Sequence, residues 1–212
     1  MGNFGLKVNR FYEIFVEQNG YVMVLEGLKN TLLIAVIGLI IGIVIGTLIA
    51  AIRTIPQYKV LPRVLNGICS VYVGIFRGTP MVVQLLVFYY VMLPLMGVKM
   101  TGVQVSMIVF GLNSAAYISE IMRSGIMSVD SGQMEAGRSL GLSKAQTMRY
   151  IIMPQAFKNV LPALCNEFVV LLKETSVAGY VAVQDLTKGG DIIRSRTYDA
   201  WTPLLIVAAV YL

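Results

Sequence analysis

Histidine is absent from this sequence, and charged side chains are scarce, at 13% of its 212 residues. Soluble globular domains have about 25% charged residues, so a soluble fold of this size would be hard to keep dispersed. The absence of histidine removes the usual ligand of haem and catalytic zinc, and the commonest general base at neutral pH. Most membrane enzymes are therefore disfavoured, and we expect neither a metal site nor a cofactor on this chain.

Cysteine is scarce as well, and no phosphate-binding loop occurs. Cys69 and Cys165 lie in apolar stretches, where a buried free thiol is favoured over a disulfide. The pattern Gly-x-x-x-x-Gly-Lys-Ser/Thr, which holds nucleotide phosphates, is missing. A dense basic block is also missing, so basic residues that flank membrane helices explain the net charge of +6 better than a nucleic-acid partner does.

Apolar residues make up 57% of the chain, and they gather in long runs. The run Thr31–Ile52 has 22 residues without a charge, and a helix of that length crosses a hydrocarbon core of about 30 Å. Windows of about 19 residues predict an all-α integral membrane protein. Its five expected spans are 25–52, 64–93, 103–122, 156–173 and 198 onward.

Two boundaries follow from these spans. Residues 1–24 form an N-terminal extension, and residues 25–212 form the transmembrane domain. The last span has 13 residues from Ala200 to Leu212, whereas about 20 are needed to cross, so we expect the native chain to continue.

The first span carries a stripe of glycines at intervals of four residues, Gly38, Gly42 and Gly46. Small residues at this spacing allow a second helix to approach closely within a membrane. The stripe therefore predicts helix packing, and we attach no other function to it.

The polar stretch between the third and fourth spans predicts a helix, a stop and a second helix. Asp130 can cap a helix over 133–140, and Gly141 can supply the left-handed residue that ends it. Ser143 with Gln146 forms a capping box for the next helix. The first helix has barely two turns and little to bury, so it needs a supporting surface. That surface is either a partner protein or the rest of this chain.

Residues in this stretch resemble the coupling-loop signature of ABC importer permeases. The signature residues are Glu135-Ala136-Gly137, Gly141 and Ile151-Ile152-Met153-Pro154. Gly137 replaces the second alanine of the family pattern, and Met153 replaces its leucine. Gly137 should loosen the short helix by about 1 kcal/mol relative to alanine.

Further motifs resemble the permeases for polar amino acids such as glutamine, glutamate, histidine and arginine, from about Gly27 to Leu212. They are Phe76-Arg77-Gly78-Thr79-Pro80, Ala116-Tyr117-Ile118-Ser119-Glu120-Ile121-Met122-Arg123, Leu142-Ser143, Met153-Pro154-Gln155-Ala156 and Leu172-Lys173-Glu174-Thr175-Ser176. The resemblance implies the five-helix permease fold of a type I importer. It also implies transport of polar amino acids by alternating access.

The resemblance further implies the partners and the orientation. The loop over about 123–155, with Glu135, Ala136, Gly137 and Gly141, would be cytoplasmic and would dock on a separate ATPase subunit that binds ATP and magnesium. A second permease copy, identical or related, and an outer substrate-binding protein would complete the complex. The N-terminus would face outward from the bacterial cytoplasmic membrane. The positive-inside rule leaves the orientation open, because each side carries eight basic residues.

Two other functions fit a chain of this kind. An ion-coupled carrier is the alternative within transport, and a membrane receptor or assembly factor is the alternative outside it. Physical reasoning alone does not separate import from export. The identity of the amino acid stays open as well.

Polar residues inside the expected spans are candidates for the substrate pathway, because ionisable groups within a membrane face a protein interior or a water-filled cavity. They are Arg77, Asn113, Tyr117, Asn166, Glu167 and Glu174. Glu120 is better explained by an i,i+3 pair with Arg123.

Glu167 is the central candidate. Glu167 and Glu174 are seven residues apart, so they share a helix face about 10 Å apart along its axis. An unpaired carboxylate in the membrane costs about 2.5–3.5 kcal/mol, so a cation or a hydrogen-bond donor should meet Glu167. The donor is either a protein group such as Arg77 or the bound amino acid. Arg77 can instead fix the kink before Pro80, and Asn113 and Tyr117 can instead bond between helices.

Overall fold

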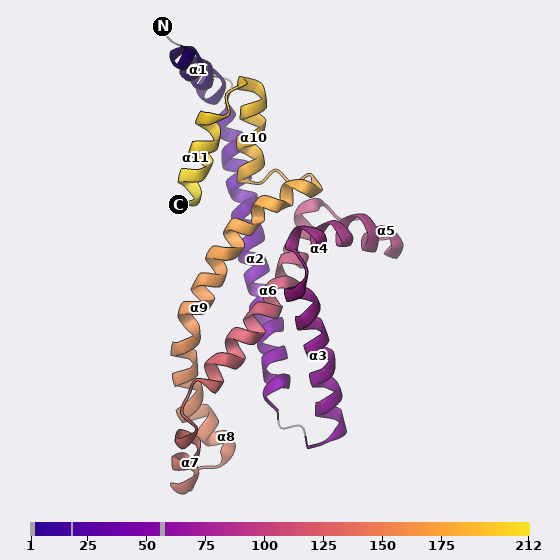
Figure 1. The fold of residues 1–212 in the computed structure, drawn as a ribbon, viewed down its shortest axis with the longest axis vertical. Coiled ribbons are helices and arrows are strands. Elements are labelled where there is room, and N and C mark those ends of the chain that lie inside the picture. The colour runs from indigo at the N-terminus through magenta and orange to yellow at the C-terminus, as the bar shows by residue number, and fades with distance from the viewer. Residues whose placement is uncertain (1–2, 18, 56–57) are drawn as a thin grey trace. The chain divides into compact units, whose positions relative to one another are not determined.

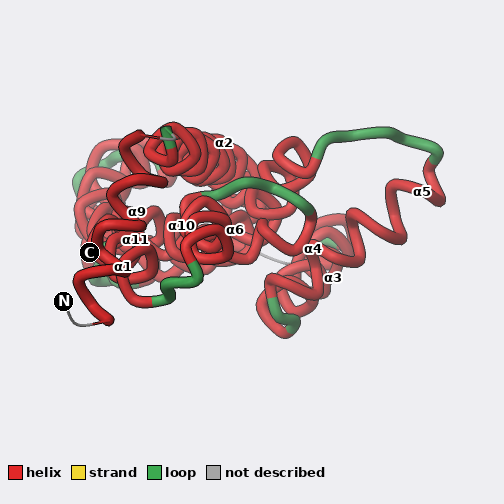
Figure 2. The backbone as a smooth tube through the Cα atoms, turned by 90° about the horizontal axis from the view of Figure 1, so that it is seen from above, coloured by secondary structure: helices red, strands yellow, loops and turns green. Residues whose placement is uncertain are grey.

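The computed structural model describes residues 3–17, 19–55 and 58–212, and all regular elements within these ranges are helical (Figure 2). This agrees with the all-α prediction. Residues 1–2 and 18 of the N-terminal extension, and residues 56–57 after the first span, lie outside the described part. The chain divides into two compact units, which are described in turn. The first unit comprises Met1–Ile37, Met81–Val109 and Leu171–Leu212; the second comprises Gly38–Pro80 and Phe110–Val170.

Three long helices contribute residues to both units: α2 (Gly20–Thr54), α6 (Gly102–Met127) and α9 (Met153–Glu174) (Figure 1). The second unit adds α3 (Val60–Gly78), α7 (Ser131–Ser139) and α8 (Lys144–Thr147). A π-helical segment, Met148–Ile152, joins α8 to α9.

The glycine stripe on α2 packs against α6 within the second unit, as predicted. A Cβ atom at Gly42 would lie 2.8 Å from Ser114 Oγ, and one at Gly46 would lie 2.9 Å from Ile118 Cβ. Gly38 meets Phe110 one turn earlier. Because real Cβ atoms do not approach so closely, glycine is what allows these two helices to touch.

The first unit holds the remaining helices, α1 (Asn3–Tyr12), α4 (Met81–Val87), α5 (Leu93–Met96), α10 (Leu186–Thr197) and α11 (Trp201–Tyr211). The segments Glu13–Glu17 and Phe88–Met92 are π-helical, and Thr175–Val181 is a 3₁₀ helix. The first half of α2 is tied to the chain before α10. Asn30 Nδ2 donates to the Gln184 carbonyl at 2.9 Å, and the Leu186 amide donates to Thr31 Oγ1 at 3.1 Å.

The span predicted over 64–93, with a kink before Pro80, is two separate helices, because the expected kink is a complete break. Helix α3 ends at Gly78, Thr79 is extended with φ −118° and ψ 144°, and α4 begins after Pro80. Proline disfavours helical dihedrals in the residue before it and donates no hydrogen bond, so the helix stops there. A hydropathy window averages over such a break.

Other expected boundaries shift by a few residues. Helix α2 begins at Gly20, after Asn19 turns the chain with φ 57°, so part of the predicted extension belongs to the first long helix. Helix α6 continues to Met127, past the predicted end at residue 122. Both cysteines are free, but Cys165 is exposed and not buried as predicted.

Three of the described helices are long and apolar enough to cross a membrane: α2, α3 and α6. The other two predicted spans correspond to α9 and α11. Helix α9 has 22 residues but includes Lys158, Pro162 and Glu167, and α11 has 11 residues.

Candidate functional site

Helix α7 has the caps that the sequence predicts. Asp130 Oδ1 accepts a hydrogen bond from the Gly132 amide at 2.7 Å at the start of the helix. At its end, Gly141 has φ +85°, its amide donates to the Arg138 carbonyl at 3.0 Å, and the Leu142 amide donates to the Gly137 carbonyl at 3.1 Å. These two bonds form a Schellman motif, which satisfies the last carbonyls and fixes the stop.

Helix α8 starts with the predicted capping box. The Gln146 amide donates to Ser143 Oγ at 3.2 Å, and the Ser143 amide donates to Gln146 Oε1 at 2.8 Å. The predicted sequence of helix, stop and helix is thereby confirmed. Its first helix spans Ser131–Ser139, a shift of one or two residues from the expected range.

Gly137 is the contact through which α7 rests on its own chain. It is buried, and a Cβ atom there would lie 2.5 Å from Thr147 Cγ2 and 3.2 Å from Ile151 Cδ1. Thr147 is fully buried and occupies the space of an alanine methyl group. The glycine that departs from the family pattern therefore has a packing reason here, and the loosening expected from it is offset by this contact.

Much of the rest of α7 is exposed. Glu135 and Ala136 are exposed, and Leu140 at the end of the helix is 81% exposed. Helix α7 thus presents an exposed acid, an exposed methyl group and an exposed leucine. Another protein can cover a surface of this kind.

Polar groups from α3 and α6 meet in the second unit. Asn113 Nδ2 donates to the Phe76 carbonyl at 3.3 Å, and the Arg77 guanidinium lies 5.3 Å from the centre of the Tyr117 ring. Tyr72 donates to the Leu112 carbonyl at 2.5 Å one turn away. The structure thus brings Arg77, Asn113 and Tyr117 together, and for Asn113 it shows the bond between helices.

Glu167 is 7% exposed and accepts a hydrogen bond from Ser114 Oγ at 2.9 Å. A hydrogen-bond donor therefore meets this carboxyl, as expected, but it is Ser114 of α6 rather than Arg77. Sequence reasoning missed Ser114. Ser114 lies opposite Gly42, where the glycine leaves space for the serine hydroxyl, and no local pattern in the sequence indicates this contact between helices.

The two remaining pathway candidates are Asn166 and Glu174. Asn166 is exposed although it precedes Glu167. Glu174 is half-buried at the last position of α9 and belongs to the first unit.

An ion cluster joins α2 and α6 in the second unit. Arg123 Nη2 lies 3.0 Å from Glu120 Oε2, which confirms the predicted i,i+3 pair. Arg53 forms a second ion pair, with Glu120 Oε1, which sequence reasoning missed. The side chains of Arg53 and Glu120 are 15% and 21% exposed, so this carboxylate is shared by two partly buried guanidinium groups.

Residues 38–212 match the protein family described as the binding-protein-dependent transport system inner membrane component. The chain belongs to this family. It is therefore a multi-pass permease subunit of the inner membrane, and the ATPase of such a system is a separate subunit.

Two relatives align in sequence with most of the permease. It is 38% identical over 188 residues to a protein named as the glutamine transport system permease GlnP of Rickettsia bellii (strain RML369-C), covering 89% of this chain and 84% of the relative. It is 36% identical over 188 residues to the arginine transport system permease protein ArtQ of Bacillus subtilis (strain 168), with the same coverage.

Solved structures show the same permease fold. A crystal structure of an amino acid ABC transporter with histidines is 39% identical, with a TM-score of 0.83 over 93% of this chain and 90% of that chain. An inward-facing MetNI methionine ABC transporter shares the fold, with a TM-score of 0.70 at 19% identity over 90% of each chain. The predicted fold class is confirmed.

In the first unit of the permease, Asp185 caps α10. Its carboxylate accepts hydrogen bonds from the amides of Thr187 at 3.0 Å and Lys188 at 3.1 Å. Burial raises the pKa of the Asp185 carboxyl above its usual range, while the amide of Lys188 acts in the opposite direction. The cap fixes the chain between α9 and α10.

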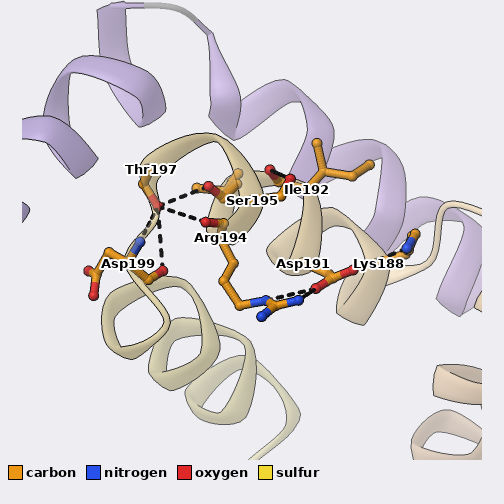
Figure 3. A network of polar contacts seen from close by, with 8 residues as sticks. Lys188, Asp191, Ile192, Arg194, Ser195, Thr197 and Asp199 are labelled. Carbon is orange, nitrogen blue, oxygen red and sulfur yellow. Dashed lines mark hydrogen bonds and ion pairs between the residues drawn. The ribbon is translucent and has the colours of Figure 1, made fainter.

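Exposed charges follow along α10 (Figure 3). Asp191 bonds Arg194 at 2.6 Å and Lys188 at 3.0 Å, and these two cations hold the pKa of the Asp191 carboxyl below its usual range. Thr197 Oγ1 accepts from the Asp199 amide at 3.2 Å, where the chain turns into α11. The permease thus has a polar segment with many hydrogen bonds between α9 and α11.

Proposed function

We propose that this permease imports polar amino acids across the bacterial cytoplasmic membrane, and that α7 couples transport to ATP hydrolysis by a separate subunit. The relatives named for glutamine and arginine transport, and the transporter crystallised with histidines, support the substrate class. The family description supports an external binding protein as a further partner.

The observation that carries the coupling role is the exposed surface of α7. The helix is held at both ends by the Asp130 cap and the Gly141 stop, and it rests on its own chain through Gly137. Glu135 and Ala136, which directly precede Gly137, are exposed. A short helix fixed in this way transmits a push from a partner groove into α8 and α9, which follow it directly.

The coupling role requires the loop over 123–155 to be cytoplasmic and the N-terminus to lie outside. The segments expected on the outer side are the N-terminus, the chain near Lys99 and residues 173–197, and all of them belong to the first unit. Residues 123–158 belong to the second unit and carry five basic and two acidic residues. The positive-inside rule does not decide between the sides, because the expected outer segments carry as many basic residues as the expected inner ones; the orientation rests on the proposed coupling role.

Alternating access needs a pathway between two permease subunits, either two copies or a related pair. We propose that Glu167 lines this pathway and favours a basic or amide side chain, with Arg77, Asn113, Tyr117 and Asn166 around it and Glu174 nearer the outer gate. Support comes from the burial of Glu167 with a neutral hydroxyl as its donor, because a carboxylate in the membrane gains from a nearby cation.

The test is ATP hydrolysis in liposomes that contain the permease with its ATPase subunit and binding protein. Arginine, histidine, glutamine and glutamate are added one at a time, with leucine as the apolar control. Polar amino acids should stimulate hydrolysis and accumulate inside. Accumulation driven by an ion gradient without ATP would overturn the proposal in favour of an ion-coupled carrier, and no transport by the intact complex would favour a receptor or assembly factor.

A further inference from the structure

An apolar groove lies in the second unit beside the coupling loop. Its cavity volume is about 340 Å³, at the lower end of the range for small-molecule pockets. The walls come from the end of α2, the last turns of α6, and the chain from α8 into α9. The lining includes Ala51 of α2, Ile126 of α6, and Met148 and Phe157 of the chain from α8 into α9, and we call this cavity the loop groove.

One charged residue, Lys144, is among the lining residues of the loop groove. Lys144 is exposed, and among the described residues its ammonium group takes part in none of the ion pairs. The hydroxyl of Thr54, also in the wall, is satisfied by the Ala50 carbonyl at 2.7 Å. The groove therefore offers apolar walls and one cation to an occupant.

We propose that the loop groove binds an acyl chain of an anionic phospholipid, with the phosphate group of the same lipid at Lys144. Helices α2 and α6 are long and apolar enough to cross a membrane, so hydrocarbon chains are the apolar material that surrounds their ends. A water-filled groove with these walls would be unfavourable.

The charge of the surrounding loop selects the headgroup. Residues 123–158 carry five basic and two acidic residues, and basic pockets between membrane helices attract anionic headgroups. A second copy of the chain fits less well. A helix with side chains is about 10–12 Å wide, which is large for a cavity of 340 Å³, and it would also have to bring an acid to Lys144.

The position of the groove gives the lipid a role. Lys144 and Met148 directly follow the stop that ends α7, and Ala51 and Ile126 lie on the two membrane helices opposite. A bound chain therefore supports the coupling loop against α2 and α6. This role rests on the proposed coupling function, whereas lipid binding itself does not.

Quenching by brominated lipids tests the binding. Trp201 is the one tryptophan of the chain, so Phe157→Trp in a Trp201→Phe background places the reporter in the groove wall. The full chain is reconstituted with brominated phosphatidylglycerol or brominated phosphatidylcholine. We expect phosphatidylglycerol to bind about fivefold more tightly, which corresponds to about 1 kcal/mol.

Three variants sharpen this test. Lys144→Gln, which keeps helix propensity, should abolish the preference for phosphatidylglycerol. Lys158→Gln removes an exposed lysine of α9 that does not line the groove, and it should leave the preference intact. Ala51→Phe, at an exposed wall position, should weaken quenching by both lipids because it fills the groove.

Equal binding of the two lipids by the reporter protein with Lys144 intact would overturn the proposal. Equal loss of preference in both lysine variants would also overturn it, because it would indicate diffuse surface charge. Protection of the reporter from both lipids, together with cross-linking between two chains at position 157, would assign the groove to a second copy. Since no ATPase subunit is needed, these outcomes are independent of the coupling proposal.

Discussion

At the scale of single residues, two glutamates of the long helices lie in different surroundings. Glu120 is paired with two arginines, whereas Glu167 accepts a hydrogen bond from a serine hydroxyl. A fully paired carboxylate is a structural element, and a carboxylate held by a neutral group can still gain from a passing cation. The two residues therefore predict different outcomes when the charge is removed.

Replacing Glu167 with Gln should reduce uptake of arginine more than uptake of glutamine. The amide still accepts the Ser114 hydrogen bond, so the helices stay together, while the attraction for a cationic substrate is lost. Uptake of both amino acids in liposomes measures this difference. A uniform loss with disturbed assembly would assign Glu167 to a structural pair, and unchanged uptake and preference would remove it from the pathway.

Replacing Glu120 with Gln should destabilise the permease by about 1–2 kcal/mol. The change leaves two partly buried guanidinium groups without their shared anion, and hydrogen bonds to charged groups are worth about 1.5–3 kcal/mol before allowance for partial exposure. Thermal unfolding in detergent measures the loss. Asp191→Asn, which breaks an exposed cluster on α10, is the matched control and should cost less than about 1 kcal/mol.

At the scale of elements, the stop between α7 and α8 depends on one backbone conformation. Gly141 has φ +85°, which a β-branched residue adopts at high cost and asparagine tolerates better. Gly141→Val should therefore uncouple transport from ATP hydrolysis or release the ATPase subunit, and Gly141→Asn should do so far less. Normal transport by Gly141→Val would show that this stop is not needed.

The contact between Gly137 and Thr147 predicts that one substitution has opposite effects on stability in two backgrounds. Gly137→Ala should destabilise the loop, because overpacking against Thr147 costs about 1–3 kcal/mol and outweighs the gain of about 1 kcal/mol in helix propensity. In a Thr147→Ala background the same change should be stabilising. Retention of the ATPase subunit during purification and thermal unfolding report on both. A destabilising Gly137→Ala in both backgrounds would contradict the packing argument.

The elements that the sequence predicts well are those specified by neighbouring residues. The caps at Asp130 and Ser143 and the left-handed Gly141 follow from local backbone chemistry, so the helices of the coupling loop could be placed within two residues. Pro80 indicated a kink, but the hydropathy average did not show that the helix ends completely at Gly78. Partners that are distant in sequence are also invisible locally, and for this reason Arg53 and Ser114 were found only in the structure.

At the scale of the whole molecule, sequence motifs and family membership agree on a permease of the inner membrane. The residues that the proposal assigns to the cytoplasmic and outer sides belong to different units. The second unit contains the coupling loop, the loop groove and Glu167, and the first contains the segments expected outside. The central claim is that α7 transmits the work of an ATPase subunit to this membrane domain.

The most direct test measures amino acid uptake and ATP hydrolysis in the same liposomes, with Glu135→Lys compared against Glu17→Lys. Both changes reverse an exposed charge, but only Glu135 lies on α7. We expect uptake per ATP hydrolysed to fall about tenfold or more in Glu135→Lys, or the ATPase subunit to be released, as for a loss of about 1.4 kcal/mol or more at the contact. Glu17→Lys should match the unmodified permease. Unchanged uptake, unchanged hydrolysis and a retained ATPase subunit in Glu135→Lys would contradict the account.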